Sequence, residues 1–99
     1  MVSNTTEPKK TDENIVFVGS KPLVNYIRSV SMLFNKNNAE KVKIKSRGKF
    51  ISKAVDIAEV AKRTIQNINV HSIDIASESF TTNEKTTNIS TMELTLARI

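Results

Sequence analysis

Six basic side chains are concentrated in the segment from residue 41 to residue 53, which contains no acidic residue. They are Lys41, Lys43, Lys45, Arg47, Lys49 and Lys53. The whole chain has 15 lysine and arginine residues against 10 acidic ones, a net charge of +5. Without these six the chain would carry a small net negative charge, so its basic character is a local feature. A concentrated basic patch of this kind indicates an anionic partner, and nucleic acid first.

The spacing within this segment divides it into a strand, a turn and the start of a helix. Basic and apolar residues alternate up to Lys45, which is the period of a half-buried strand with a cationic outer row. Arg47 and Lys49 then flank Gly48, which allows a sharp bend or a close approach to another group. Free N–H groups at the start of the following helix favour anions. We therefore predict a phosphate-binding loop at Arg47, Gly48 and Lys49, with Lys45 and Lys53 at its edges.

A further cation, Lys21, precedes a helix that is predicted to begin at Pro22, with Ser20 or Lys21 in the capping position. A positive charge at a helix N-terminus opposes the macrodipole and costs about 0.3–1 kcal/mol unless an anion offsets it. If the strands before Lys21 and Gly48 pair in parallel, both loops lie at one end of the sheet and contact the same phosphate backbone. A solvated Lys21 side chain is the alternative, and the residues alone do not decide between them.

The chain has little from which to build a catalytic or metal site. It has no cysteine, and its single histidine, His71, excludes sites that need two histidines. Its two glycines, Gly19 and Gly48, form neither a P-loop nor a GxGxxG motif. Asp56 and Glu59 are expected on a solvated helix face rather than as a pair of catalytic carboxylates. We therefore expect neither an enzyme nor a cofactor.

The aromatic residues do not suggest a platform for stacking bases. Tyr26 and most of the phenylalanines fall on apolar stripes, so we expect them in the core. Phe50, beside the basic loop, and Phe80, near the end of a hairpin, are the two expected at the surface. The predicted mode of binding is therefore contact with the phosphate backbone, with little sequence selectivity and no single-strand stacking.

Apolar periodicity predicts the elements that position these residues. Residues 15–18 are a continuous apolar run and indicate a strand buried on both faces. Helical spacing predicts helices over residues 22–35 and 50–67. The helix-length crossover between the strands at 15–18 and 41–45 predicts that they pair in parallel. On the second helix we expect burial of Ile51, Ala54, Val55, Ala58, Ala61, Ile65 and Ile68.

The last part of the chain is predicted to form a hairpin. Alternation of apolar and polar residues predicts strands over residues 70–80 and 87–98, with abundant threonine, which strands favour. The connection from Thr81 to Thr86 contains no glycine. We therefore expect a loop longer than two residues, with flanking strands that project beyond the core. Lys85 is the one basic residue of this connection.

The remaining composition bounds the domain and its place in the cell. Residues 1–13 are polar and lack periodicity, so we expect a disordered tail, followed by a single domain over residues 14–99. The sequence has no apolar signal segment and no apolar run of the roughly 20 residues that cross a bilayer. We expect a cytoplasmic protein without membrane association.

Two segments resemble the Alba family of archaeal chromatin proteins. Residues 15–26, IVFVGSKPLVNY, are similar to the family's strand–Gly–Lys–Pro–x–x–Asn–Tyr opening. Residues 43–56, KIKSRGKFISKAVD, are similar to its Arg-Gly-basic turn and the helix start that follows. The resemblance implies an α+β fold, a two-layer β-α-β-α-β-β sandwich like the C-terminal domain of translation initiation factor three. It would have a mixed four-stranded sheet and two helices.

The resemblance also implies a homodimer that binds double-stranded DNA, and often RNA, with little sequence preference, and dimers that associate on DNA. The arm from Thr81 to Thr86 would reach toward the minor groove. The predicted nucleic-acid-binding residues are Lys21, Lys45, Arg47, Gly48, Lys49, Lys53 and Lys85. The predicted function is a non-enzymatic, nucleoid-associated protein that organises or compacts archaeal DNA.

Two other functions stay open at this point. One is an RNA-binding role, as a subunit of a ribonucleoprotein such as ribonuclease P or as an RNA-stabilising protein. The other is a protein-interaction module whose basic face meets an acidic partner. A steep dependence of affinity on salt separates nucleic-acid binding from the last of these.

Overall fold

The structure of the protein is a computed structural model that describes residues 14–99. Its elements in chain order are β2 (Ile15–Phe17), α2 (Leu23–Asn35), β3 (Lys41–Arg47), the 3-10 turn η1 (Gly48–Phe50), α3 (Ile51–Thr64), β4 (Ile68–Thr82) and β5 (Lys85–Arg98). The predicted disordered tail, residues 1–13, lies outside the described residues. No helix in the described part of the chain is long and apolar enough to cross a membrane.

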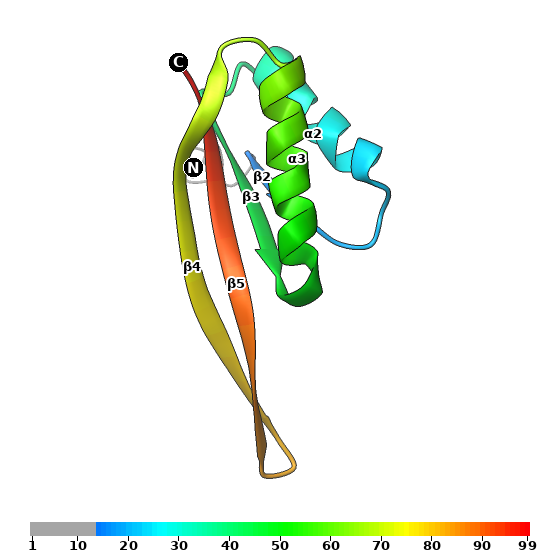
Figure 1. The fold of residues 1–99 in the computed structure, drawn as a ribbon, viewed down its shortest axis with the longest axis vertical. Helices are drawn as coiled ribbons and strands as arrows, with labels where there is room; N and C mark the ends of the chain where they lie inside the picture. Colours follow the sequence, from blue (N-terminus) through cyan, green and yellow to red (C-terminus); the bar gives the residue numbers. More distant parts are fainter. Residues whose placement is uncertain (1–13) are drawn as a thin grey trace, which may run out of the picture.

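The four strands form one mixed sheet in the order β2-β3-β5-β4. β2 and β3 pair in parallel, whereas β3 pairs with β5, and β5 with β4, in antiparallel fashion. Both helices pack on the same face of this sheet, and residues 14–99 leave the other face open (Figure 1). The predicted two-layer α+β fold is therefore confirmed, and so is the parallel pairing of the first two strands.

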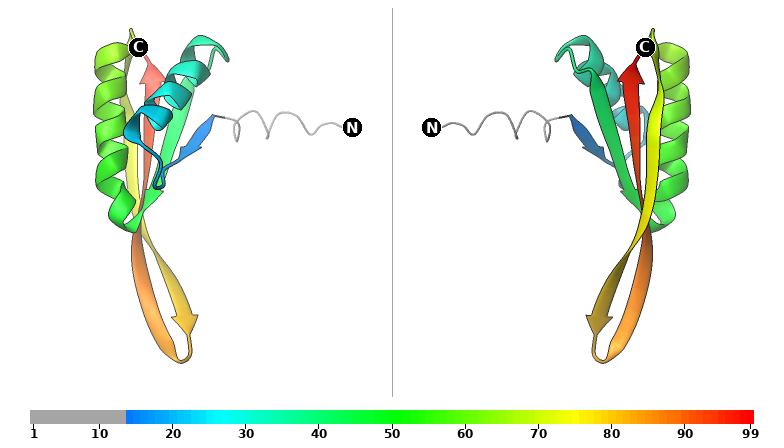
Figure 2. Two further views of the ribbon diagram at one scale, coloured as in Figure 1. Left: turned by 90° about the vertical axis from the view of Figure 1, so that its right-hand side faces the viewer. Right: turned by 90° about the vertical axis from the view of Figure 1, so that its left-hand side faces the viewer.

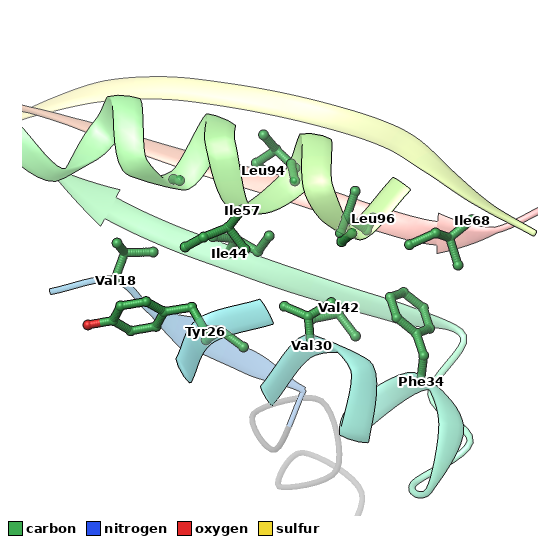
Figure 3. Close-up of a cluster of buried hydrophobic side chains, with 14 of the residues drawn as sticks. Val18, Tyr26, Val30, Phe34, Val42, Ile44, Ile57, Ile68, Leu94 and Leu96 are labelled. Atoms are coloured by element: carbon green, nitrogen blue, oxygen red, sulfur yellow. The ribbon is translucent and has the colours of Figure 1, made fainter. Parts of the chain in front are cut away.

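The core lies between the helices and the covered face of the sheet (Figure 3). Its largest fully buried side chains are Phe34, Ile44, Ile57, Leu96, Val30 and Val42. Val42 and Ile44 point inward from β3 because successive side chains of a strand face opposite sides, as their alternation with lysines predicts. Burial of each such side chain contributes about 1.5–3 kcal/mol to the stability of the fold.

The first strand differs from its prediction. Val16 and Val18 are buried, but the Phe17 side chain between them is 70% exposed. β2 lies at an edge of the sheet and the helices cover only one of its faces, so its alternate side chain points to the open face. The prediction of burial on both faces was wrong because a continuous apolar run does not reveal whether a second layer covers it.

The ends of the helices also differ from prediction. α2 begins at Leu23 with Pro22 in the N-cap position, so the cap expected at Ser20 or Lys21 is wrong. α3 ends at Thr64 instead of continuing to residue 67. Asn67 adopts a left-handed φ of 64°, which turns the chain into β4.

The buried stripe of α3 differs from the predicted one at two positions. Ile57 is fully buried, whereas Val55 is 42% exposed. Ala54, Ala58 and Ala61 are buried as predicted, and their small side chains allow the helix to lie close to the sheet. Burial of Val55 was therefore wrongly predicted, and its exposure leaves an apolar side chain on the surface of α3.

A long hairpin projects from the body of the protein (Figure 2). Thr82 pairs with Lys85, so the turn has only two residues, Asn83 and Glu84, with φ of 49° and 65°. The predicted longer loop was wrong: positive φ at both central residues is typical of a type I′ turn, which this chain forms without glycine. Pairing of β3 with β5 ends at Thr91. The strands beyond it project for about 20 Å, as expected, at about 3.4 Å per residue.

Candidate nucleic-acid interface

Parallel pairing of β2 and β3 brings the two predicted loops to the same end of the sheet. The Val18 N–H donates to the Lys45 carbonyl over 2.9 Å, so the chain leaves β2 for Gly19 beside the last residues of β3. α2 and α3 both begin near this end, and neither has an acidic residue in its first turn. The positive ends of two helix dipoles are therefore left without a neutralising carboxylate, an arrangement that favours anions.

Two side chains fix the backbone of the first loop. The Tyr26 hydroxyl accepts hydrogen bonds from the N–H groups of Gly19, at 2.8 Å, and of Lys21, at 3.1 Å. The Lys53 ammonium donates to the carbonyls of the same two residues, at 2.9 Å and 2.7 Å. The Lys53 Nζ atom also lies 5.5 Å from the centroid of the Tyr26 ring. The loop from Gly19 to Lys21 is therefore tied both to α2 and to α3.

These contacts give Lys53 a role in addition to the one predicted for it. Two of the three donors of its ammonium group are used by loop carbonyls. Tyr26 was predicted only as a core residue, and its hydroxyl was missed as an anchor for the loop. The signal was present in the sequence, because a buried tyrosine usually requires a hydrogen-bond partner for its hydroxyl, whereas phenylalanine does not.

The second loop turns at Gly48, whose φ of 56° is left-handed and ends β3 before α3 begins. Lys49 follows, and its Nζ atom lies 5.5 Å from the centroid of the Phe50 ring. Lys53 approaches the same ring at 5.8 Å, so this partly buried phenylalanine supports two cations. Within residues 14–99, neither Lys21 nor Lys49 forms an ion pair. Both are therefore available to an external anion.

The lysines of the β3 outer row are partnered across the sheet. Lys43 and Lys45 flank Glu93 of β5, with Nζ–Oε distances of 3.6 Å and 3.2 Å. The hydrogen bond from Lys45, together with the charges of both lysines, holds the pKa of Glu93 below its usual value, although burial acts in the opposite direction. Exposed pairs of this kind contribute only about 0.2–1 kcal/mol. A phosphate can therefore replace the carboxylate at little cost.

Arg47 is partnered in the same way by the hairpin. Its guanidinium lies 3.2 Å from an oxygen of Glu78 and 5.2 Å from the centroid of the Phe80 ring. Both members of the ion pair are about half exposed. Since Phe80 is itself 41% exposed, it lies at the surface as predicted. The hairpin therefore positions Arg47 and partly neutralises it.

The predicted residues fall into two places. The structure gathers Lys21, Lys45, Arg47, Gly48, Lys49 and Lys53 at the loop end of the sheet. Lys85 stands at the tip of the projecting hairpin, beside Glu84. It is therefore separated from the loops by the length of the arm, about 20 Å at the rise of an extended strand.

Comparison with known proteins identifies the family of the chain. The model of the Alba family matches residues 14–79, from β2 into β4. The chain belongs to the Alba family. A protein of Thermoplasma acidophilum named DNA/RNA-binding protein Alba is 44% identical over 88 residues, which cover 88% of this chain and 98% of that protein. DNA/RNA-binding protein Alba 1 of Archaeoglobus fulgidus is 44% identical over 87 residues, covering 87% of this chain and 97% of the relative.

A solved structure supports the same assignment. Alba from Thermoplasma volcanium superposes with a TM-score of 0.77 at 44% sequence identity, covering 86% of this chain and all of that one. The two segments that resemble the family, residues 15–26 and 43–56, are those that build the two loops. In this Alba-family chain, the segments with the clearest likeness therefore contain the candidate interface.

Proposed function

We propose that this protein is a non-enzymatic nucleoid protein that binds double-stranded DNA, and RNA, through phosphate contacts with little sequence preference. The observation that carries the proposal is the convergence of two helix starts and their cations at one end of the sheet. Lys21 and Lys49 contact phosphates directly, while Arg47 and Lys45 exchange their carboxylate partners for phosphate. Lys53 holds the loop and adds positive charge. The names of the relatives, DNA/RNA-binding protein Alba, support this chemistry.

Residues 14–99 act in this proposal as one nucleic-acid-binding domain, and the hairpin acts as an arm. Gly48 allows the second loop to turn with a left-handed φ of 56° between Arg47 and Lys49. Lys85 at the tip follows the duplex beyond the body and reaches toward its minor groove. Binding through the phosphate backbone makes the protein a general organiser of archaeal DNA, associated with the nucleoid in the cytoplasm.

The working form of the protein is a homodimer. Ile73 and Ile75 of β4 are 55% and 80% exposed, and they share the sheet face of their buried partners Leu94 and Met92. These two side chains offer an apolar surface at the edge of the sheet that a second copy would bury. A two-fold dimer presents two copies of each loop to one duplex and so doubles the phosphate contacts. We extend the proposal to dimers that bind side by side along the DNA backbone and associate with one another.

RNA is the second candidate ligand, because the names of the relatives include it alongside DNA. The loops contact phosphates, which both duplexes offer, so this interface does not favour one strongly over the other. A role in a ribonucleoprotein, or in stabilising RNA, would use the same residues.

The test is binding of the wild-type protein to duplex DNA and duplex RNA of the same sequence across a range of salt concentrations. We expect log affinity to fall linearly with log salt, with a slope near −0.9 for each phosphate neutralised on DNA. Unrelated sequences should bind with similar affinity. A flat response to salt, or no binding to either duplex, contradicts the proposal and leaves an acidic protein as the partner of the basic surface.

A further inference from the structure

The open face of the sheet carries two exposed aromatic rings, each beside a cation. Phe17 of β2 is 70% exposed, and the Lys45 Nζ atom lies 5.8 Å from its ring centroid. Phe80 of β4 is 41% exposed, with the Arg47 guanidinium 5.2 Å from its centroid. Lys45 and Arg47 are alternate residues of β3 and share one face, so they stand about 7 Å apart. The two rings therefore flank a short cationic row.

A hollow lies on this face beside Lys45 and Arg47. It has a volume of about 510 Å³ and is lined by Phe17, Lys45, Arg47, Asp74, Glu78 and Glu93, among others. That volume is within the range of pockets that bind small molecules. The helices lie on the opposite side of the sheet, so they do not cover the hollow (Figure 2).

Three cations of this face are paired with carboxylates, unlike Lys21 and Lys49 of the two loops. Glu93 pairs with Lys43 and Lys45, Glu78 pairs with Arg47, and Asp74 lies opposite Glu93 on β4. The paired carboxylates weaken the attraction of this face for phosphate, although Lys45 and Arg47 can exchange them for it. The carboxylates of this face can accept hydrogen bonds from the amino groups of bases. Its aromatic rings offer flat apolar surfaces on which bases can stack.

We propose that the open face of the sheet binds the bases of single-stranded nucleic acid, with Phe17 and Phe80 as stacking surfaces. The inference rests on the proposed function, because the loops at the same end of the sheet hold the phosphates of the strand. A single strand has bases whose faces are free to stack, whereas a duplex keeps them inside its own stack. Phe17 was predicted to be buried, which excluded it as a stacking surface, but its side chain is exposed.

The proposal separates two kinds of contact that salt distinguishes. Phosphate contacts by Lys49 or Arg47 contribute to the slope of log affinity against log salt. Stacking on Phe17 adds affinity without releasing counterions. Loss of the ring should therefore lower the affinity for single strands while leaving the salt slope unchanged, and it should not affect duplex binding.

The test compares wild type with Phe17→Leu and Phe80→Leu on single-stranded RNA, single-stranded DNA and the DNA duplex of the same sequence. Ile99→Leu is the control, because Ile99 is 85% exposed and follows β5 at the end of the sheet away from the loops. We expect Phe17→Leu to weaken single-strand binding roughly tenfold, which corresponds to the loss of one stacked base. The duplex affinity of Phe17→Leu and all affinities of the control variant should stay within about twofold of wild type. Comparison of single-stranded RNA with single-stranded DNA shows whether the sugar affects the affinity.

Two results would overturn the proposal. One is unchanged single-strand binding in Phe17→Leu, and the other is an equal loss for the duplex. Photo-crosslinking of single strands that contain 4-thiouridine gives an independent measurement, since the crosslinked peptide should include Phe17; crosslinks confined to the loops contradict it. If a poly-glutamate peptide displaces single strands and loses its own affinity in Phe17→Leu, the face binds a protein instead. In each case, steep salt dependence on the duplex would leave the proposed function intact, so the two failures are distinguishable.

Discussion

Lys53 and Tyr26 bind the same two loop residues with complementary chemistry. The ammonium group donates to the carbonyls of Gly19 and Lys21, and the phenol accepts from their N–H groups. Lys53 belongs to α3 and Tyr26 to α2, so this clamp links both helices to the loop that carries Lys21. Lys53 therefore acts on the interface indirectly, by holding the backbone of the loop that carries Lys21.

From this clamp we predict that Tyr26→Phe lowers the stability of the folded protein without changing the charge of the interface. The N–H groups of Gly19 and Lys21 would lose their acceptor, which costs about 1–2 kcal/mol. Urea denaturation measures this loss, and the salt slope of duplex binding should stay at its wild-type value. Lys49→Ala is the converse control: it should leave stability within about 0.5 kcal/mol and lower the slope. Equal stability of Tyr26→Phe and wild type would show that the clamp does not hold the loop.

The ion pair between Arg47 and Glu78 predicts a variant that binds more tightly. Glu78→Gln frees the guanidinium and removes a negative charge, so duplex affinity should rise about 1.5- to 5-fold, the value of an exposed pair. The measurement is a binding titration at low salt. Glu59→Gln is the matched control, because Glu59 pairs with Lys62 on α3, away from the loops. Weaker binding by Glu78→Gln would mean that the pair positions Arg47 more than it neutralises it.

Glu93 predicts a specific dependence of stability on pH. Its pKa is lowered in the folded protein, so its pairs stabilise the fold above its ordinary pKa of 4.5. This contribution is lost as the pH falls below that value and through the folded pKa. Glu93→Gln should therefore be less stable than wild type by about 0.2–1 kcal/mol near pH 7, and equally stable in strong acid. Urea unfolding of both proteins over this range is the measurement, and a difference that does not change with pH contradicts the assignment.

The apolar surface of β4 predicts a variant that dissociates. Ile75 is 80% exposed, so Ile75→Glu should not disturb the core of the protomer. It would place two like charges in a two-fold interface, and sedimentation should find monomers where wild type is dimeric. Met32→Glu, at an exposed position of α2, serves as the control and should remain dimeric. A dimeric Ile75→Glu would locate the interface elsewhere.

The sequence predicted those parts of the molecule that depend on local pattern. Alternation identified β3 and its outer row, and the flanks of Gly48 identified the loop, because strand period and backbone freedom are properties of neighbouring residues. The exposure of Phe17 could not be predicted, since it depends on which face of an edge strand the helices cover. The pairing of Arg47 with Glu78 depends on the register of the hairpin, and the type I′ turn at Asn83 lacked the glycine that usually marks one.

The central claim is that the two loops bind phosphate at one end of the sheet. The most direct measurement is the salt slope of duplex DNA binding for wild type, Arg47→Ala, Lys49→Ala and Lys62→Ala. Lys62 lies near the far end of α3, in an ion pair with Glu59, and serves as the control cation. We predict that the loop variants each lower the slope by about one for every DNA sequence, while the control does not. Slopes equal to wild type in both loop variants, or an equal drop in Lys62→Ala, would contradict the claim.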